Sequence, residues 1–133
     1  MEIRSTRNIA EDAAAFERPD TLGTHTWWLV QRDTVGAEKL VVNRGELPPG
    51  TTHQLHRHPH AEQGLIVVAG RGLHLRAEGD PVPMEEGDVV HIPAGEWHGF
   101  TNPYDETVVI ASVYGGVGSR EEAGYELLAP QSE

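Results

Sequence analysis

The sequence predicts a single all-β domain. Short runs of apolar, aromatic and β-branched residues recur about every 8 to 12 residues, and turns rich in Gly, Pro and Asp separate them. The chain has 133 residues, which suffices for one sandwich or barrel with a substantial core and leaves no room for a second domain. A jelly roll is one architecture of this kind.

The N-terminal segment precedes the main strands. Its first residues are polar except for an apolar stretch at 13–16, which predicts one or two helical turns before Pro19 or, equally well, an irregular arm. The segment 24–30 is rich in aromatic and β-branched residues and should be a strand that covers a sheet edge or a partner subunit. Trp27 and Trp28 are neighbours on this strand, so they point to opposite faces and one of them can enter the barrel.

The central strands follow at regular intervals. They are expected at 37–47, at the His-bearing segment after the turn 48–50, and at 65–68, 73–76, 89–93 and 107–114. The strands at 65–68 and 73–76 are joined by a Gly-rich turn, which predicts a hairpin.

The C-terminal segment contains a helix signal. Ser119 and Glu122 have the spacing of a capping box, which predicts a short helix weakened by Gly124; a surface tail is the alternative. We therefore divide this one domain into an N-terminal arm with the first strand (1–35), a barrel core (36–116) and a C-terminal tail or short helix (117–133).

Three histidines suggest a metal site. His56 and His58 stand two residues apart in a predicted strand, where the period of two places both imidazoles on one face. His98 follows 40 positions after His58 in a segment punctuated by Gly and Pro, so the chain can fold back and supply a third imidazole. Imidazole suits zinc, copper, iron and nickel, and three histidines with one oxygen ligand make a mononuclear site. The alternative is that histidines are merely frequent, since the chain has eight.

The same segments resemble the two motifs of the cupin superfamily. The spacing of the first motif is matched, with Gln where Glu is more usual, by Gly50, His56, His58, Gln63 and Gly70. The second motif fits at every position, namely Gly87, Pro93, Gly95, His98 and Asn102. The resemblance covers about positions 36 to 114. It implies a small jelly-roll barrel that holds one divalent metal through His56, His58, Gln63 and His98.

Glu62 competes with Gln63 for the fourth ligand position. The two are neighbours on a strand, so only one of them can face inward. Counted back from Gly70, the family spacing selects Gln63, with Leu65 and Val67 on its face as the apolar lining of the pocket. A looser form of the motif would select Glu62.

A neutral fourth ligand has an electrostatic consequence. Three imidazoles and an amide leave a divalent ion with its full formal charge, whereas a Glu ligand would cancel one unit of it. The site should therefore favour an anionic chelator such as an enolate, a 2-oxo acid or a hydroxy acid. Four protein ligands leave two adjacent positions open on an octahedral ion, so iron, manganese, nickel or cobalt are expected ahead of zinc, which prefers a closed tetrahedron.

Other residues are candidates for the pocket. His60 follows a proline in a turn and is the candidate catalytic residue, as a proton shuttle at the barrel mouth, because imidazole titrates near neutrality. Trp97 and Phe100 flank a ligand histidine and are expected to bound the pocket or to pack behind it. Alternation along the His-bearing strand turns Gln54 toward the pocket and His53 toward solvent. The remaining histidines are expected to be structural, namely His25, His74 and His91.

Composition limits the partners. The formal net charge of −11, from 21 acidic and 10 basic residues, argues against nucleic acids and anionic membranes, because no basic stripe can neutralise phosphates. There is no cysteine, which excludes disulfides and thiolate ligands.

The first residues lack an apolar segment of signal-peptide length, and no apolar run of about 18 residues occurs, so we expect a soluble cytoplasmic protein. Short strands with edges to cover predict a homodimer.

Two classes of function fit these observations. The first is a metalloenzyme that activates an enolisable carbonyl compound, a 2-oxo acid or a hydroxy acid by bidentate chelation, either as a dioxygenase or as a redox-neutral isomerase or lyase. The second is a non-catalytic binding or sensor protein that uses the metal for recognition. The enzyme is favoured because no DNA-binding or effector domain is attached, but cupins have many activities and the sequence does not specify the substrate.

Overall fold

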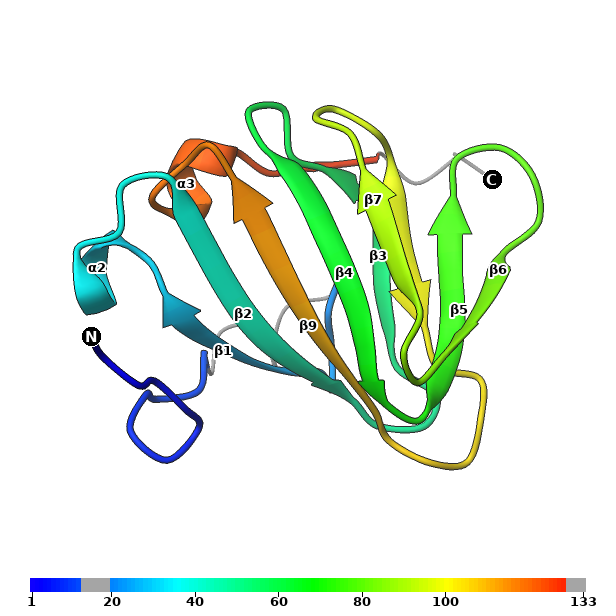
Figure 1. Cartoon of the computed structure of the whole chain (residues 1–133). Coiled ribbons are helices and arrows are strands. Elements are labelled where there is room, and N and C mark those ends of the chain that lie inside the picture. The colour runs from blue at the N-terminus through cyan, green and yellow to red at the C-terminus, as the bar shows by residue number, and fades with distance from the viewer. Residues whose placement is uncertain (13–19, 129–133) are drawn as a thin grey trace.

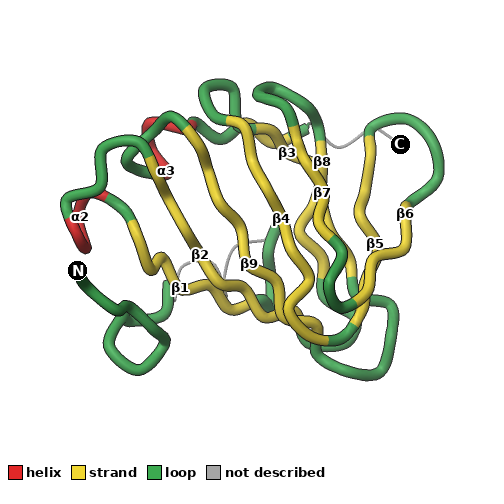
Figure 2. Tube along the Cα trace, in the orientation of Figure 1, coloured by secondary structure: helices red, strands yellow, loops and turns green. Residues whose placement is uncertain are grey.

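Two five-stranded antiparallel sheets face each other and enclose the interior (Figure 1). The computed structural model describes residues 1–12 and 20–128, and every statement on structure concerns these residues. The predicted helical turn at 13–16 lies outside them. This arrangement is a jelly-roll barrel, which confirms the predicted all-β fold. Strands dominate the trace, and the helical turns lie beyond the ends of strands (Figure 2).

The first sheet has the order β1-β2-β9-β4-β7. Its strands are β1 (His25–Val30), β2 (Leu40–Leu47), β9 (Val108–Gly115), β4 (Glu62–Ala69) and β7 (Val89–Ile92). The second sheet has the order β10-β3-β8-β5-β6. Its strands are β10 (Glu126–Leu127), β3 (Thr52–Arg57), β8 (His98–Thr101), β5 (Arg71–Arg76) and β6 (Val82–Glu85). The two helical turns are α2 (Arg32–Val35), which the sequence did not predict, and α3 (Arg120–Ala123).

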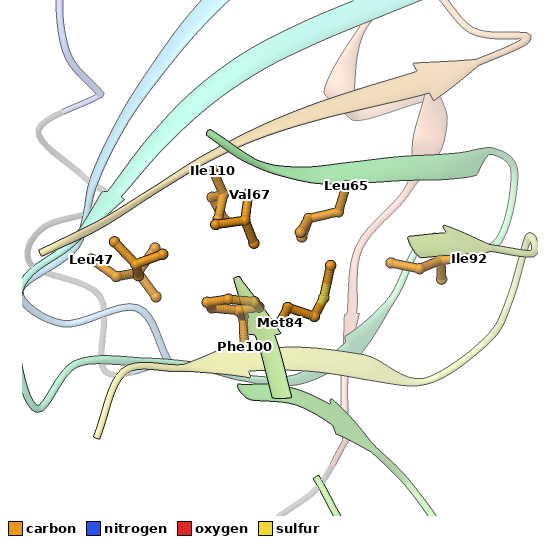
Figure 3. Packing of buried hydrophobic residues seen from close by; sticks show 8 residues of the cluster. Leu47, Leu65, Val67, Met84, Ile92, Phe100 and Ile110 are labelled. Atoms are coloured by element: carbon orange, nitrogen blue, oxygen red, sulfur yellow. The ribbon is translucent and has the colours of Figure 1, made fainter. Parts of the chain in front are cut away.

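The apolar core fills one part of the space between the sheets. Strands β2 and β9 alternate buried and more exposed residues, as strands with one face on a core do. Eight side chains from both sheets form the main cluster (Figure 3): Leu47, Leu65, Val67, Met84, Ile92, Phe100, Val108 and Ile110. Elsewhere in the interior, polar, aromatic and aliphatic side chains together line a cavity.

Strand β1 confirms the prediction that its two tryptophans point to opposite faces. Trp28 faces inward, where its ring lies 6.0 Å from the ring of Tyr114, measured between centroids. Trp27 faces outward, with the guanidinium carbon of Arg44 5.6 Å from its ring centroid. The outer edge of β1 makes an isolated bridge between Trp27 and Glu11. The homodimer stays a prediction.

The predicted hairpin between 65–68 and 73–76 is wrong. Strand β4 pairs with β7 and β9, whereas β5 pairs with β6 and β8 in the other sheet. Between them Gly70 adopts a positive φ of 79°, and a Cβ there would stand 2.9 Å from the carbonyl oxygen of Thr107. The glycine therefore makes a tight corner between sheets. Two apolar runs around a glycine look the same in sequence whether they form a hairpin or a corner.

The C-terminal helix is confirmed, with a changed cap. The Oγ of Ser119 accepts a hydrogen bond from the backbone N–H of Glu122 at 3.1 Å, as an N-cap does. The Glu122 carboxylate reaches the N–H of Gly118 at 3.0 Å, one residue before the position that a full capping box requires. Beyond α3, β10 pairs with β3. Neither helix in the described part of the chain has the length that a membrane crossing requires.

Candidate metal centre

The two sheets bring His56, His58 and His98 together. His56 lies in β3 opposite His98, the first residue of β8, and His58 follows the end of β3. All three side chains are buried, and their potential ligand atoms lie within 4.8 Å of one another. The ring centroids of His56 and His98 are 4.3 Å apart. Such a cluster can hold a metal ion.

Backbone carbonyls orient the three imidazoles. The Nδ1 of His56 lies 2.7 Å from the carbonyl oxygen of Gln54, and the Nδ1 of His98 lies 2.9 Å from that of Glu96. The Nδ1 of His58 lies 2.9 Å from the carbonyl oxygen of Gly124. A carbonyl oxygen only accepts, so each Nδ1 carries the proton and each Nε2 keeps its lone pair. This is the arrangement in which metal-binding histidines are usually held.

Two of the three Nε2 lone pairs are without a protein partner in the described part of the chain. The Nε2 atoms of His58 and His98 are buried and have no hydrogen-bond partner among the described residues. Burial lowers the pKa of His56 to about 2 and the pKa of His98 to about 4, with the neighbouring imidazoles adding to the effect. Burial also lowers the pKa of His58. The three rings are therefore neutral at pH 7, which is the state that binds metal.

Gln63 supplies an unpaired oxygen to the same cavity. Its side chain is 5% exposed, and its Nε2 donates to the Oγ of Ser112 at 3.0 Å. Its Oε1 is buried without a hydrogen-bond partner among the described residues. Glu62 instead lies exposed on the outer face, where its Oε1 is 2.9 Å from the Nε2 of His91. The donor atoms that fit a metal ion here are thus three imidazole nitrogens and one amide oxygen. The carboxylate of Glu62 lies on the outer face of the barrel and is not one of them.

The histidines open onto a cavity of about 350 Å³. Its walls combine aliphatic and aromatic side chains with polar ones, and the chain ends add charged ones: Leu65, Phe100, Ile110, Trp28, Tyr114, Tyr125, Thr26, Asn43, Ser112, Asp12, Arg120 and Glu121. Tyr114 and Asn43 are hydrogen-bonded through their side chains, and burial raises the pKa of Tyr114, so its hydroxyl stays protonated. A largely apolar cavity with a few placed polar groups is the usual form of a small-molecule site.

Two predictions for β3 are corrected. Gln54 is exposed rather than directed to the pocket, and it contributes only its backbone carbonyl. His53 lines the cavity, where its Nε2 lies 3.1 Å from the Oγ1 of Thr24. The pairing register of β3 with β8 shifts between His53 and His56, so an irregularity there breaks the alternation from which the two orientations were predicted.

Other expected pocket residues lie elsewhere. Trp97 is not among the cavity-lining residues; it lies on another surface, with the guanidinium carbon of Arg57 4.6 Å from its ring centroid. Val67 is fully buried in the apolar cluster and does not reach the cavity. His60 is exposed in its turn and is likewise absent from the lining, so the structure does not place the candidate catalytic imidazole beside the cavity. Leu65 and Phe100 do line it.

Both chain ends contribute to the cavity, which the motifs did not indicate. Arg120, at the start of α3, pairs with Asp12 of the N-terminal arm. Tyr125 donates its hydroxyl to Asp20, and its ring stacks on His56 with centroids 4.9 Å apart. The aromatic character of 125 was visible in the sequence. Its position was not, because it depends on how the tail crosses the barrel.

Two facing sheets around three convergent imidazoles define a β-barrel protein with a histidine cluster that could hold a metal ion. The chain belongs to the cupin domain family, whose match spans residues 43–114. This confirms the resemblance read from the two motifs. It also agrees with the distribution of the site, because the three histidines lie inside the matched segment and the residues of the chain ends lie outside it.

Known proteins similar to the chain include enzymes. It is 36% identical to a gentisate 1,2-dioxygenase of Ralstonia sp over 64 residues, which are 47% of this chain and 18% of that protein. Its fold matches the polyketide cyclase RemF of Streptomyces resistomycificus with a TM-score of 0.75 and 22% identity, over 86% and 79% of the two chains. It also matches a cupin 2 conserved barrel domain protein of Salinispora arenicola with a TM-score of 0.65 and 28% identity, over 86% and 88%.

Proposed function

We propose that the protein is a mononuclear metalloenzyme that acts on a small oxygen-rich molecule through bidentate chelation. One observation carries this proposal: three imidazoles are held by their Nδ1 protons around one cavity, and the amide oxygen of Gln63 in its lining has no hydrogen-bond partner among the described residues. The residues that would hold the ion are His56, His58, His98 and Gln63. Iron, manganese, nickel or cobalt suits this set, and zinc is the less favoured choice.

The charge of the ligand set supports an anionic substrate. Every proposed ligand is neutral, so none of them would cancel the formal charge of a bound divalent ion. The metal would act there as a Lewis acid on the oxygen atoms of the substrate. The preferred substrates are therefore enolisable carbonyl compounds, 2-oxo acids and hydroxy acids.

The aromatic lining of the cavity supports an unsaturated or aromatic substrate. Ring surfaces around the site come from Trp28, Phe100, Tyr114 and Tyr125. The protonated hydroxyl of Tyr114 can donate a hydrogen bond to a substrate oxygen. Two proteins similar to this chain are named for gentisate and for a polyketide, which agrees with this class of substrate. Dioxygenase and redox-neutral isomerase or lyase chemistry both remain within the proposal.

The first prediction is one divalent transition metal per chain. Protein purified without added metal should contain it by elemental analysis, and His56→Ala or His58→Ala should abolish stoichiometric binding. His91→Ala is the matched control, since that imidazole is exposed and pairs with Glu62 outside the barrel. Full metal occupancy in both ligand variants would refute the site.

Turnover separates the enzyme from a binding protein. The metal-loaded chain should be assayed with a panel of diketones, 2-oxo acids and phenols, following oxygen consumption with an electrode and isomerisation or cleavage by absorbance. Turnover that disappears in His56→Ala supports the enzyme. Tight binding of panel compounds without turnover of any of them would instead favour the sensor or binding protein.

A further inference from the structure

Among the described residues, the carboxamide of Gln63 has a single side-chain hydrogen-bond partner, which is Ser112. The Nε2 of Gln63 donates to the Oγ of Ser112 at 3.0 Å, and the two side chains are 5% and 3% exposed. The nitrogen and the oxygen of a carboxamide are bonded to the same carbon and point in different directions within one plane. Fixing the nitrogen at Ser112 therefore turns Oε1 away from Ser112, and this oxygen is the buried atom that has no partner among the described residues.

The strands hold this pair in register. Gln63 in β4 lies opposite Tyr114 of β9, and Ser112 lies opposite Leu65, so Gln63 and Ser112 are diagonal neighbours on the same inward face. On its other side, β9 pairs with β2, where Asn43 lies opposite Ser112. Because both strands are central in the sheet, the hydroxyl sits at a fixed position relative to the amide.

We propose that Ser112 is a positioning residue, which presents the oxygen of Gln63 rather than its nitrogen to the metal. This inference rests on the proposed metal site and adds a requirement to it. A carboxamide that flips would present its NH2 group, whose lone pair is delocalised and does not bind a cation. A carboxylate ligand has two equivalent oxygens and would need no such device, so the requirement follows from having Gln at this position.

The test measures metal affinity and coordination, using Co²⁺ because its visible absorption reports its ligands. Ser112→Ala should weaken Co²⁺ binding by about tenfold, the lower end of what losing a group that orients a ligand typically costs. The absorption bands of the bound ion should change at the same time. Ser112→Thr, which keeps the hydroxyl, should restore most of the affinity.

A double-mutant cycle with Gln63→Leu separates positioning from a general structural effect. If Ser112 acts through Gln63, Ser112→Ala should change Co²⁺ affinity by less than about twofold in the Gln63→Leu background. An equal loss in both backgrounds, or no loss in either, would overturn the inference. Ser112→Cys keeps the side-chain volume with a weak acceptor and makes the same comparison if Ser112→Ala does not fold.

The same titration distinguishes the inference from the proposed function. If the unmodified protein binds no Co²⁺ at any accessible concentration, the metal site itself fails and the role of Ser112 fails with it. If the unmodified protein binds Co²⁺ tightly and Ser112→Ala binds it equally well, only the positioning role is refuted.

Discussion

The carboxamide of Gln63 is the residue that decides the charge of the proposed site. It occupies a buried position where a carboxylate would also fit in size, and its oxygen is unpaired. Gln63→Glu should therefore bind the cation more tightly and hold anionic ligands more weakly. A unit charge about 4 Å away is worth about 4 kcal/mol at an effective dielectric of about 20, so even a fraction of it should weaken a chelating carboxylate by about tenfold. Titration of the metal-loaded variant with a 2-oxo acid measures this.

Glu62→Gln is the matched control for that variant. The Glu62 side chain is exposed and pairs with His91 on the outer face, so its loss should leave the affinity for the anion unchanged. An unchanged affinity in Gln63→Glu combined with a large change in Glu62→Gln would return the fourth position to Glu62.

Among single residues, the histidine spacing predicted that the imidazoles could meet but not what orients them. A period of two is a property of any strand, so His56 and His58 could be placed on one face from sequence. The carbonyl that orients His58 belongs to Gly124, 66 residues later, beyond the family match. Nothing local to the histidine indicates such a partner, because it depends on where the chain returns.

At the scale of elements, the close approach of β3 and β8 positions the site. Gly99 lies between His98 and Phe100, and a Cβ at Gly99 would stand 2.6 Å from the carbonyl oxygen of His53. Backbone cannot move away as a flexible side chain can. The absence of a side chain at 99 is therefore what allows the strand carrying His56 to pack beside the strand that begins with His98.

Gly99→Ala tests this packing. The substitution should lower the free energy of unfolding by about 2 kcal/mol or more, since overpacking of this kind typically costs about 1–3 kcal/mol. It should also weaken Co²⁺ binding by displacing His56. Urea unfolding and metal titration measure the two effects.

The matched control is Gly64→Ala in β4. In the described part of the chain, no atom beyond the two neighbouring residues lies within 4 Å of a Cβ built there, and its φ is not positive. Alanine should leave the metal affinity unchanged and stabilise the chain slightly, by about 0.5 kcal/mol, because glycine is costly in a strand. Equal destabilisation by both substitutions would contradict the role given to the contact at Gly99.

The irregularity in β3 shows why alternation failed for one strand. The register with β8 shifts between His53 and His56, so the residues before the shift face opposite to what a regular strand predicts. Gln54 and His53 exchanged roles for this reason. No turn residue in the segment 53–56 marked the irregularity in the sequence.

For the whole molecule, the buried imidazoles link stability to pH. The pKa of His98 is lowered to about 4 and that of His56 to about 2, whereas imidazoles in an unfolded chain titrate near about 6.5. At a pH between the folded-state pKa and the unfolded-state pKa of a histidine, the unfolded chain binds more protons than the folded one. The free energy of unfolding of the metal-free protein should therefore have its full value above about pH 6.5. It should fall as the pH decreases below that value, by up to about 1.4 kcal/mol per pH unit for each histidine.

Urea unfolding of the metal-free protein at pH 7, 6 and 5 measures this slope. The difference between the unmodified protein and His98→Gln reports the imidazole of His98 together with its effect on the neighbouring His56, whose pKa it helps to lower. The variant should lose less stability between pH 7 and 5. Equal slopes in the two proteins would show that His98 is protonated as easily in the folded state as in the unfolded one.

The sequence by itself determined the all-β class, the positions of most strands along the chain and the set of candidate ligands. These follow from local rules: side-chain period, turn residues and motif spacing. Tertiary structure alone decided the corner at Gly70, the packing of Tyr125 on His56, the pairing of Arg120 with Asp12 and the contact of Gln63 with Ser112. Each of these depends on which distant segments meet across the barrel, and their pairing is fixed by the packing of the whole chain rather than by any single stretch of it.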